Sequence, residues 1–137
     1  MPGKRRRART VALMALYEAD TVGHDPQASL ERLLGETPLP ADAQEFARHL
    51  VMGVLAHRKE IDEVIQRAAP AWPLEQVAVI DRNILRLAIF ETLIDNKVPV
   101  RAAINEAVEL AKFFGSQASS KFVNGVLGAV SLMASHH

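Results

Sequence analysis

The chain has 137 residues, of which 49% are hydrophobic, with no cysteine and a net charge of zero. This length supports one domain or two small subdomains that share a core, and the hydrophobic content is ample for a packed interior. The absence of cysteine excludes disulfides and cysteine-held metal sites, and no apolar run approaches the roughly twenty residues of a membrane span. Glu18 and Asp20 fall where a signal peptide would have its apolar stretch, so we expect a soluble, cytoplasmic protein.

Five basic residues open the first predicted helix, which runs from about Arg5 to Thr21. They precede apolar residues that are spaced as on one buried helical face, and they are Lys4, Arg5, Arg6, Arg7 and Arg9. Because the whole chain is neutral, the residues after this cluster carry a net charge of −5. Clustered positive charges repel one another and are unfavourable at the positive end of a helix dipole, so a bound polyanion would stabilise them. Arginine also binds phosphate bidentately and stacks on bases, which favours nucleic acid over an acidic membrane surface or a merely solubilising charge run.

The rest of the chain also has helical periodicity. Asp25 and Pro26 are an N-cap and a first helical residue, and they begin a short helix to about Leu34 that Gly35 ends. Further helices are predicted over residues 41–57, 59–69, 80–95, 100–114 and 119–134, with a short turn at 74–77. The proline-bounded segment Pro70-Ala71-Trp72-Pro73 predicts a boundary between an N-terminal half, about 1–70, and a C-terminal half, about 74–137. No stretch alternates with period two, so the predicted fold class is all-α with about seven helices.

The predicted helix over 80–95 has a middle that is apolar nearly all round, so it should be the most buried element. Asp81 near its start suits the helix dipole. Arg86 lies inside so apolar a segment that an internal ion pair is the favoured explanation, with Glu91 or Glu106 as candidate partners.

No set of residues in the sequence supports catalysis, a cofactor or a metal ion. Glu45, His49 and His57 have helical spacing but lack a third strong ligand. The serines of residues 116–120 have no nucleophile-elbow glycines around them and are predicted to cap the last helix, while Gly115 ends the helix before it. Two further glycines, Gly125 and Gly128, predict a place where another backbone approaches that helix closely.

A cation, an aromatic ring and an amide lie together at the start of the last predicted helix, as Lys121, Phe122 and Asn124. Such a trio can stack on and hydrogen-bond an unpaired base. Alternatively, Phe122 completes the core and Asn124 caps neighbouring backbone. We predict base stacking, because the apolar stripe of this helix is already supplied by Val123, Val126, Leu127 and Val130.

Four segments of the chain carry a resemblance to a known family. After the basic start, residues 12–17 read Ala-Leu-Met-Ala-Leu-Tyr, and residues 81–88 read Asp-Arg-Asn-Ile-Leu-Arg-Leu-Ala. Residues 103–112 read Ala-Ile-Asn-Glu-Ala-Val-Glu-Leu-Ala-Lys, and residues 121–127 read Lys-Phe-Val-Asn-Gly-Val-Leu. Together these segments resemble the NusB family of transcription antitermination factors over the whole chain, and the last two are highly specific in combination.

The resemblance implies a fold of two packed three-helix bundles and a function without enzymatic activity. It implies binding to single-stranded boxA RNA of nascent ribosomal-RNA transcripts, in a transcription elongation complex, with a small-subunit ribosomal protein that serves as NusE. In this family the basic N-terminal helix and the Lys-Phe-Val-Asn region contact RNA. We expect the ribosomal protein to dock on Glu75, Asp81 and Arg82. Ala118 departs from the acidic or polar residue that is common in this loop of the family.

Two alternatives from other functional classes remain open at this point. The first is a helical protein-interaction or homodimerising domain with a weak RNA site or none. The second is a stand-alone targeting domain for an RNA methyltransferase, because a related domain occurs fused to such enzymes. We expect no catalytic domain within these 137 residues.

Overall fold

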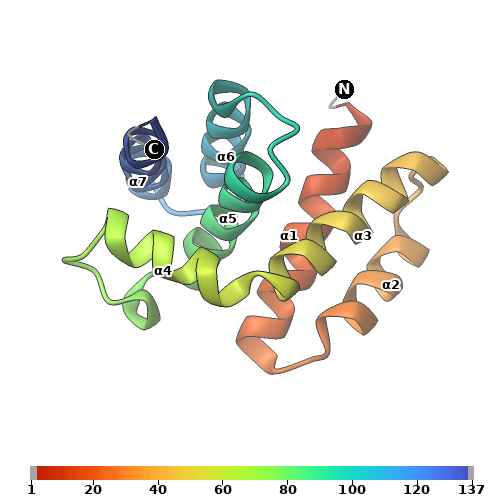
Figure 1. Ribbon diagram of the computed structural model, residues 1–137. Helices are drawn as coiled ribbons and strands as arrows, with labels where there is room; N and C mark the ends of the chain where they lie inside the picture. The colour runs from red at the N-terminus through yellow and green to blue at the C-terminus, as the bar shows by residue number, and fades with distance from the viewer. Residues whose placement is uncertain (1–2, 136–137) are drawn as a thin grey trace. The chain divides into compact units, whose positions relative to one another are not determined.

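The computed structural model describes residues 3–135, and within that range every regular element is helical (Figure 1). The elements are α1 (Lys4–Val22), α2 (Pro26–Glu36), α3 (Ala41–Ala56), α4 (Arg58–Ala68), η1 (Leu74–Gln76), α5 (Val79–Ile89), η2 (Phe90–Ile94), α6 (Val100–Phe114) and α7 (Ser119–Ser135). Seven of these are α-helices in the described part of the chain, and the predicted all-α class is confirmed. The chain forms two compact units, one up to Ala56 and one from His57 onwards.

In the first unit, α1 packs against both α2 and α3. The small residues Ala8, Ala12 and Ala15 are fully buried on α1, as their spacing predicts, and Leu13 beside them is fully buried too. Small side chains on this face allow the helices to approach closely. Leu30 of α2 and Leu50 of α3 complete this core with almost no exposure.

The turn from α1 to α2 follows from its local sequence. Gly23 adopts the left-handed conformation with φ of 74°, which favours glycine, and its N–H bonds to Ala19. Asp25 caps α2 as predicted, accepting a hydrogen bond of 3.3 Å from the backbone N–H of Ala28. The prediction that Gly35 stops α2 is wrong by two residues. The helix continues through Glu36, and Thr37 is extended because the following Pro38 disfavours helical geometry before it.

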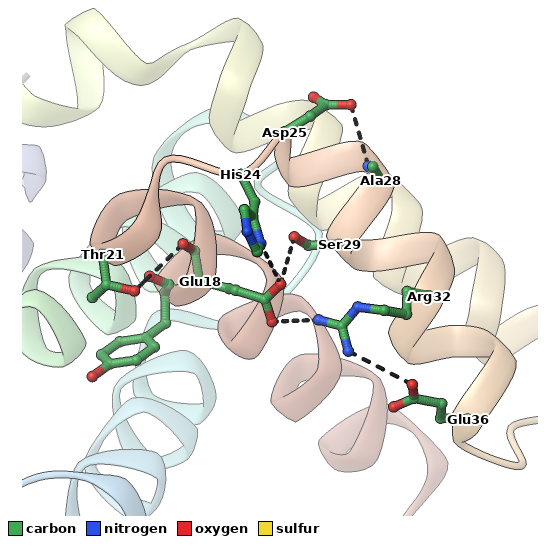
Figure 2. Close-up of polar contacts among 9 residues, drawn as sticks. Glu18, Thr21, His24, Asp25, Ala28, Ser29, Arg32 and Glu36 are labelled. Atoms are coloured by element: carbon green, nitrogen blue, oxygen red, sulfur yellow. Dashed lines mark hydrogen bonds and ion pairs between the residues drawn. The ribbon is translucent and has the colours of Figure 1, made fainter.

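Glu18 joins α1 to α2 through three polar contacts (Figure 2). Its Oε1 accepts a hydrogen bond from the Ser29 hydroxyl at 3.0 Å and lies 3.0 Å from His24 Nδ1. Its Oε2 pairs with the guanidinium of Arg32, which also reaches Glu36. The hydrogen bond from Arg32, with those from His24 and Ser29, lowers the pKa of Glu18 to about 2. The ionised carboxylate is therefore the form that the native fold favours.

We expect Glu18→Gln to reduce stability at neutral pH and to flatten the acid dependence of unfolding. The pKa of Glu18 is depressed from 4.5 to about 2 on folding, so its contribution is fully present above pH 4.5 and is lost as pH falls towards 2. Melting temperatures of wild type and variant should therefore converge across that window. Glu63→Gln, which removes an exposed carboxylate on α4, is the matched control and should leave the two curves parallel. A Glu18→Gln curve parallel to wild type would contradict this role.

In the second unit, α5 packs against α4, α6 and α7. Every residue over 84–90 is at most 4% exposed, which confirms the prediction that this helix is the most buried element. Its last turn is wider than predicted. Residues 90–94 form a π-turn, closed by a 2.8 Å hydrogen bond from the N–H of Asp95 to the carbonyl of Phe90.

Arg86 is buried in this unit and makes the internal ion pair that the sequence predicts. Its Nε donates to Asp62 Oδ1 at 2.8 Å and its Nη2 to Asp62 Oδ2 at 3.2 Å. Its Nη1 donates to Asn83 Oδ1 at 3.1 Å, and Asn83 in turn donates to the carbonyl of Val79. The pair ties α4 to α5, and Asp62 was not among the carboxylates that the sequence suggested.

The boundary between the two units differs from the one that the proline-bounded segment predicts. The predicted boundary lies at residues 70–73, whereas the contacts divide the structure between Ala56 and His57. The reason is that α4 packs on α5 and α7 and pairs with Arg86 through Asp62. Residues 69–73 are thus a loop inside the second unit. The first unit has three α-helices and the second has four, where the family resemblance implies three in each.

Gly115 ends α6 as predicted, but glycine is needed there because no room exists for a side chain and not because the backbone is left-handed. Its backbone is extended, with φ of −94°, and its N–H bonds to the carbonyl of Ala111. A Cβ at this position would clash with the side chain of Ser119 and lie 2.8 Å from the carbonyl of Ala111. The predicted close approach at Gly125 and Gly128 is not found among residues 3–135, because a Cβ at either position would meet nothing within 4 Å.

Candidate nucleic-acid interface

The basic cluster lies at an exposed helix start, where Asp42 of α3 pairs with one of its cations, Lys4. Lys4, Arg5 and Arg6 are exposed, Arg7 is partly buried, and the first turn of α1 contains no acidic residue. Gly3 at the N-cap position has no side chain to accept from the first N–H groups. The positive end of the helix dipole and four cationic side chains therefore coincide, which is the electrostatic arrangement of an anion site.

Neighbouring groups of the first unit orient these side chains. Arg7 Nη2 donates to the carbonyl of Pro38 at 2.6 Å, and the guanidinium of Arg5 lies 4.2 Å from the centre of the Phe46 ring. Lys4 pairs with Asp42, and this hydrogen bond lowers the pKa of the Asp42 carboxyl below its ordinary value. Because a guanidinium has five N–H donors, one internal contact leaves others to face a phosphate.

Arg9 differs from the rest of the cluster. It is only 7% exposed, and its guanidinium lies 5.2 Å from the centre of the Phe46 ring, which Arg5 also contacts. A side chain so buried supports the packing of α1 on α3. Although Arg9 was predicted to contact RNA, its burial removes it from the set of exposed cations.

The second predicted cluster lies at the start of α7 in the second unit. Lys121 and Asn124 are exposed, while Phe122 is only partly buried. The predicted apolar stripe is confirmed, because each of its residues is at most 5% exposed: Val123, Val126, Leu127 and Val130. Phe122 thus lies beside the core of α7 rather than within it. The structure places this cluster and the basic cluster in two different units.

The predicted partner residues have three different environments. Glu75 is exposed on η1. The Nη1 of Arg82 lies 3.4 Å from the carbonyl oxygen of Leu74 and 3.5 Å from that of Val77, at the ends of the η1 turn. Asp81, which was predicted to present its charge at a surface, is only 7% exposed, and its Oδ1 has no hydrogen-bond partner among residues 3–135. The helix start that carries Asp81 is packed into the unit, so this carboxylate is not a surface charge.

The other sequence candidates have structural contacts. The buried Ser119 hydroxyl accepts a 2.9 Å hydrogen bond from the N–H of Ser116, which ties the loop before α7 to the start of that helix. Glu45 pairs with Arg48, and His57 hydrogen-bonds Glu60. Over residues 3–135, no group of three His, Cys, Asp or Glu side chains could hold a metal ion. None of the described helices is long and apolar enough to cross a membrane.

These features define a class of protein before any comparison is made. The molecule is an all-α protein with a cationic helix start in one unit and a partly exposed aromatic residue beside a cation and an amide in the other. These are features of helical proteins whose function is to bind nucleic acid.

Comparison with known proteins identifies the family. The family model described as NusB family matches residues 6–131. A "Transcription antitermination protein NusB" from Dehalococcoides mccartyi is 51% identical over 131 residues, covering 96% of this chain and 92% of the relative. The solved structure of T. maritima NusB superimposes with a TM-score of 0.88 at 37% identity, covering 96% of this chain and 93% of that one. The chain belongs to the NusB family, whose curated relatives are transcription antitermination proteins.

One further solved structure bears on the site. It is described as antitermination factors NusB and NusE in complex with dsRNA. Its matching chain is 29% identical to this one with a TM-score of 0.88, and the match covers 97% of this chain and 99% of that chain. In that relative, therefore, the same fold is associated with an RNA and a protein partner.

Proposed function

We propose that this protein is an RNA-binding antitermination factor that binds boxA-like single-stranded RNA of nascent ribosomal-RNA transcripts. It does so in the transcription elongation complex, together with the small-subunit ribosomal protein that serves as NusE. The observation that carries this proposal is the cationic start of α1, with Lys4, Arg5, Arg6 and Arg7 at the positive end of a helix dipole. Family membership and the solved complex of NusB and NusE with dsRNA support binding to RNA and to this partner, while the preference for a single strand rests on the α7 cluster.

The two clusters suit different parts of an RNA strand, one the phosphates and the other an unpaired base. Lys4 and the three arginines neutralise phosphates, which provides affinity without reading sequence. Lys121, Phe122 and Asn124 meet an unpaired base, since a ring can stack on it and an amide can hydrogen-bond its edge. Unpaired bases expose these groups, and a duplex does not, which favours a single strand as the ligand.

We place the contact with the ribosomal partner at η1. Glu75 is the exposed charge there, and Arg82 lies against the carbonyl groups at both ends of the turn that carries it. An exposed carboxylate suits the rim of an interface with a basic ribosomal protein, where it speeds association.

Binding to fluorescently labelled RNA tests the proposed function. We expect a boxA-like single strand to bind more tightly than a strand of the same composition in scrambled order, and more tightly than a duplex. Adding the purified ribosomal protein should tighten binding to the boxA-like strand. Equal affinities for all three RNAs, unchanged by the partner, would contradict the proposal and identify a general polyanion-binding protein.

Glu75→Lys tests the proposed contact with the ribosomal protein. It should slow association with the ribosomal protein and leave RNA binding by the isolated chain intact. Glu63→Lys, on the exposed side of α4, makes the same change of charge in the same unit and should do neither.

A further inference from the structure

The most exposed large aromatic ring next to the α7 cluster belongs to a residue that the sequence analysis assigned only to a loop. Trp72 is 55% exposed, and its indole meets Phe122 edge to face, with ring centres 6.2 Å apart and an interplanar angle of 78°. About half of the Trp72 side chain therefore stays in water, although burying its apolar surface in the core would be favourable. A large exposed ring whose orientation is fixed by a second aromatic residue is suited to stacking on a flat ligand.

Hydrogen bonds to Gln66 and to the backbone of Ala69 hold the loop that carries Trp72. Gln66 on α4 donates from Nε2 to the carbonyl of Trp72 at 2.7 Å and accepts at Oε1 from the N–H of Leu74 at 3.1 Å. The N–H of Trp72 also bonds to the carbonyl of Ala69, and Pro70 and Pro73 restrict the backbone on both sides. The indole is therefore presented by a rigid loop, which lowers the entropy cost of using it to bind a ligand.

We propose that Trp72 is a base-stacking residue, and that Trp72 and Phe122 together receive one unpaired base of the RNA. The inference rests on the proposed function and extends it to a residue outside the predicted set. Trp72 supplies the exposed ring, and its edge-to-face contact with Phe122 fixes the orientation of the indole. Lys121 and Asn124, which flank Phe122 on exposed positions of α7, supply a cation for the phosphate and an amide for the base edge.

A protein partner is the other class of occupant for an exposed aromatic ring. The residues around Phe122 favour RNA, because a lysine and an asparagine at one helix start match a phosphate and a base edge. The chain also offers a comparison within the same unit. Phe113 is 80% exposed and packs edge to face on Phe114, with ring centres 4.7 Å apart, at the C-terminal end of α6. Phe113 is thus an exposed ring beside a second, partly buried one, and it is not part of α7.

Tryptophan fluorescence of the full chain tests the inference directly, because Trp72 is the single tryptophan in the sequence. We expect a boxA-like single strand to quench the emission of Trp72 and to protect it from acrylamide. Trp72→Ala should weaken RNA affinity roughly tenfold or more, whereas Trp72→Phe, which keeps a ring, should lose only a small part of it. Phe113→Ala is the matched control and should bind like wild type.

The outcomes separate this inference from the proposed function. RNA binding by anisotropy with unchanged Trp72 emission, and wild-type affinity in Trp72→Ala, would overturn the stacking role and leave the function intact. Loss of affinity for the ribosomal protein alone in Trp72→Ala would assign the ring to the protein partner and also overturn it. Absence of RNA binding by the wild-type chain would overturn both. Circular dichroism of each variant excludes unfolding as the cause.

Discussion

Arg86→Ala is expected to destabilise the protein by about 3–5 kcal/mol, near the lower end of that range. Arg86 is only 3% exposed, and its guanidinium makes two hydrogen bonds to Asp62 and one to Asn83. Truncation leaves the Asp62 carboxylate without this counter-charge and opens space in the most buried helix. The Asp62 side chain is 24% exposed, so water recovers part of the loss. Urea unfolding of wild type and variant measures the difference.

Two further variants show whether the effect comes from the buried ion pair. The double variant Asp62→Leu/Arg86→Met replaces both charges with apolar groups and should be more stable than Arg86→Ala, which leaves the Asp62 carboxylate with only the more distant Arg58 at 3.7 Å. Lys112→Ala removes an exposed cation that pairs with Glu109 on α6, and it should cost no more than about 1 kcal/mol. A loss in Arg86→Ala as small as that in Lys112→Ala would contradict the assignment.

The second large effect is expected in RNA binding. Replacing Arg5, Arg6 and Arg7 together by alanine should weaken affinity for a single strand on the order of a hundredfold at about 0.1 M salt, since three phosphate contacts are lost. The same variant should lose about 1–2 kcal/mol of stability, through the Arg5 contact with Phe46 and the Arg7 bond to the Pro38 carbonyl. Binding is therefore compared by anisotropy well below the melting temperature of the variant.

A matched control separates local charge from net charge. Lys59, Lys97 and Lys112 are exposed lysines of the second unit, and changing all three to alanine removes the same three positive charges. This variant should retain most of the RNA affinity. An equal loss in both triple variants would assign RNA binding to the overall charge of the protein and not to the start of α1.

The sequence predicted those features that depend on residues close together in the chain. The Asp25 cap, the buried alanine face of α1 and the extent of α6 all follow from spacings within a few residues. The internal pairing of Arg86 was predictable from the apolar helix around it. Its contact with Asp62 was not, because that carboxylate is 24 residues away and is brought near only by the packing of α4 on α5.

The site was predicted less completely for a related reason. The exposure of a polar residue depends on which elements pack around it, so Arg9 and Asp81 were predicted as surface charges although both are only 7% exposed. Trp72 was assigned to a proline-bounded loop, and its contact with Phe122 joins residues 50 positions apart. The available signal was a single tryptophan between two prolines, where a core role is uncommon.

The salt dependence of RNA affinity tests the central claim most directly. If Lys4, Arg5, Arg6 and Arg7 each neutralise one phosphate, log affinity for a single strand should fall against log salt with a slope of about −3. The Arg5, Arg6 and Arg7 triple alanine variant should have a slope of about −1, while the control triple of Lys59, Lys97 and Lys112 should keep the wild-type slope. A slope in the arginine variant equal to that of wild type would contradict the account, because it would place the phosphate contacts elsewhere on the molecule.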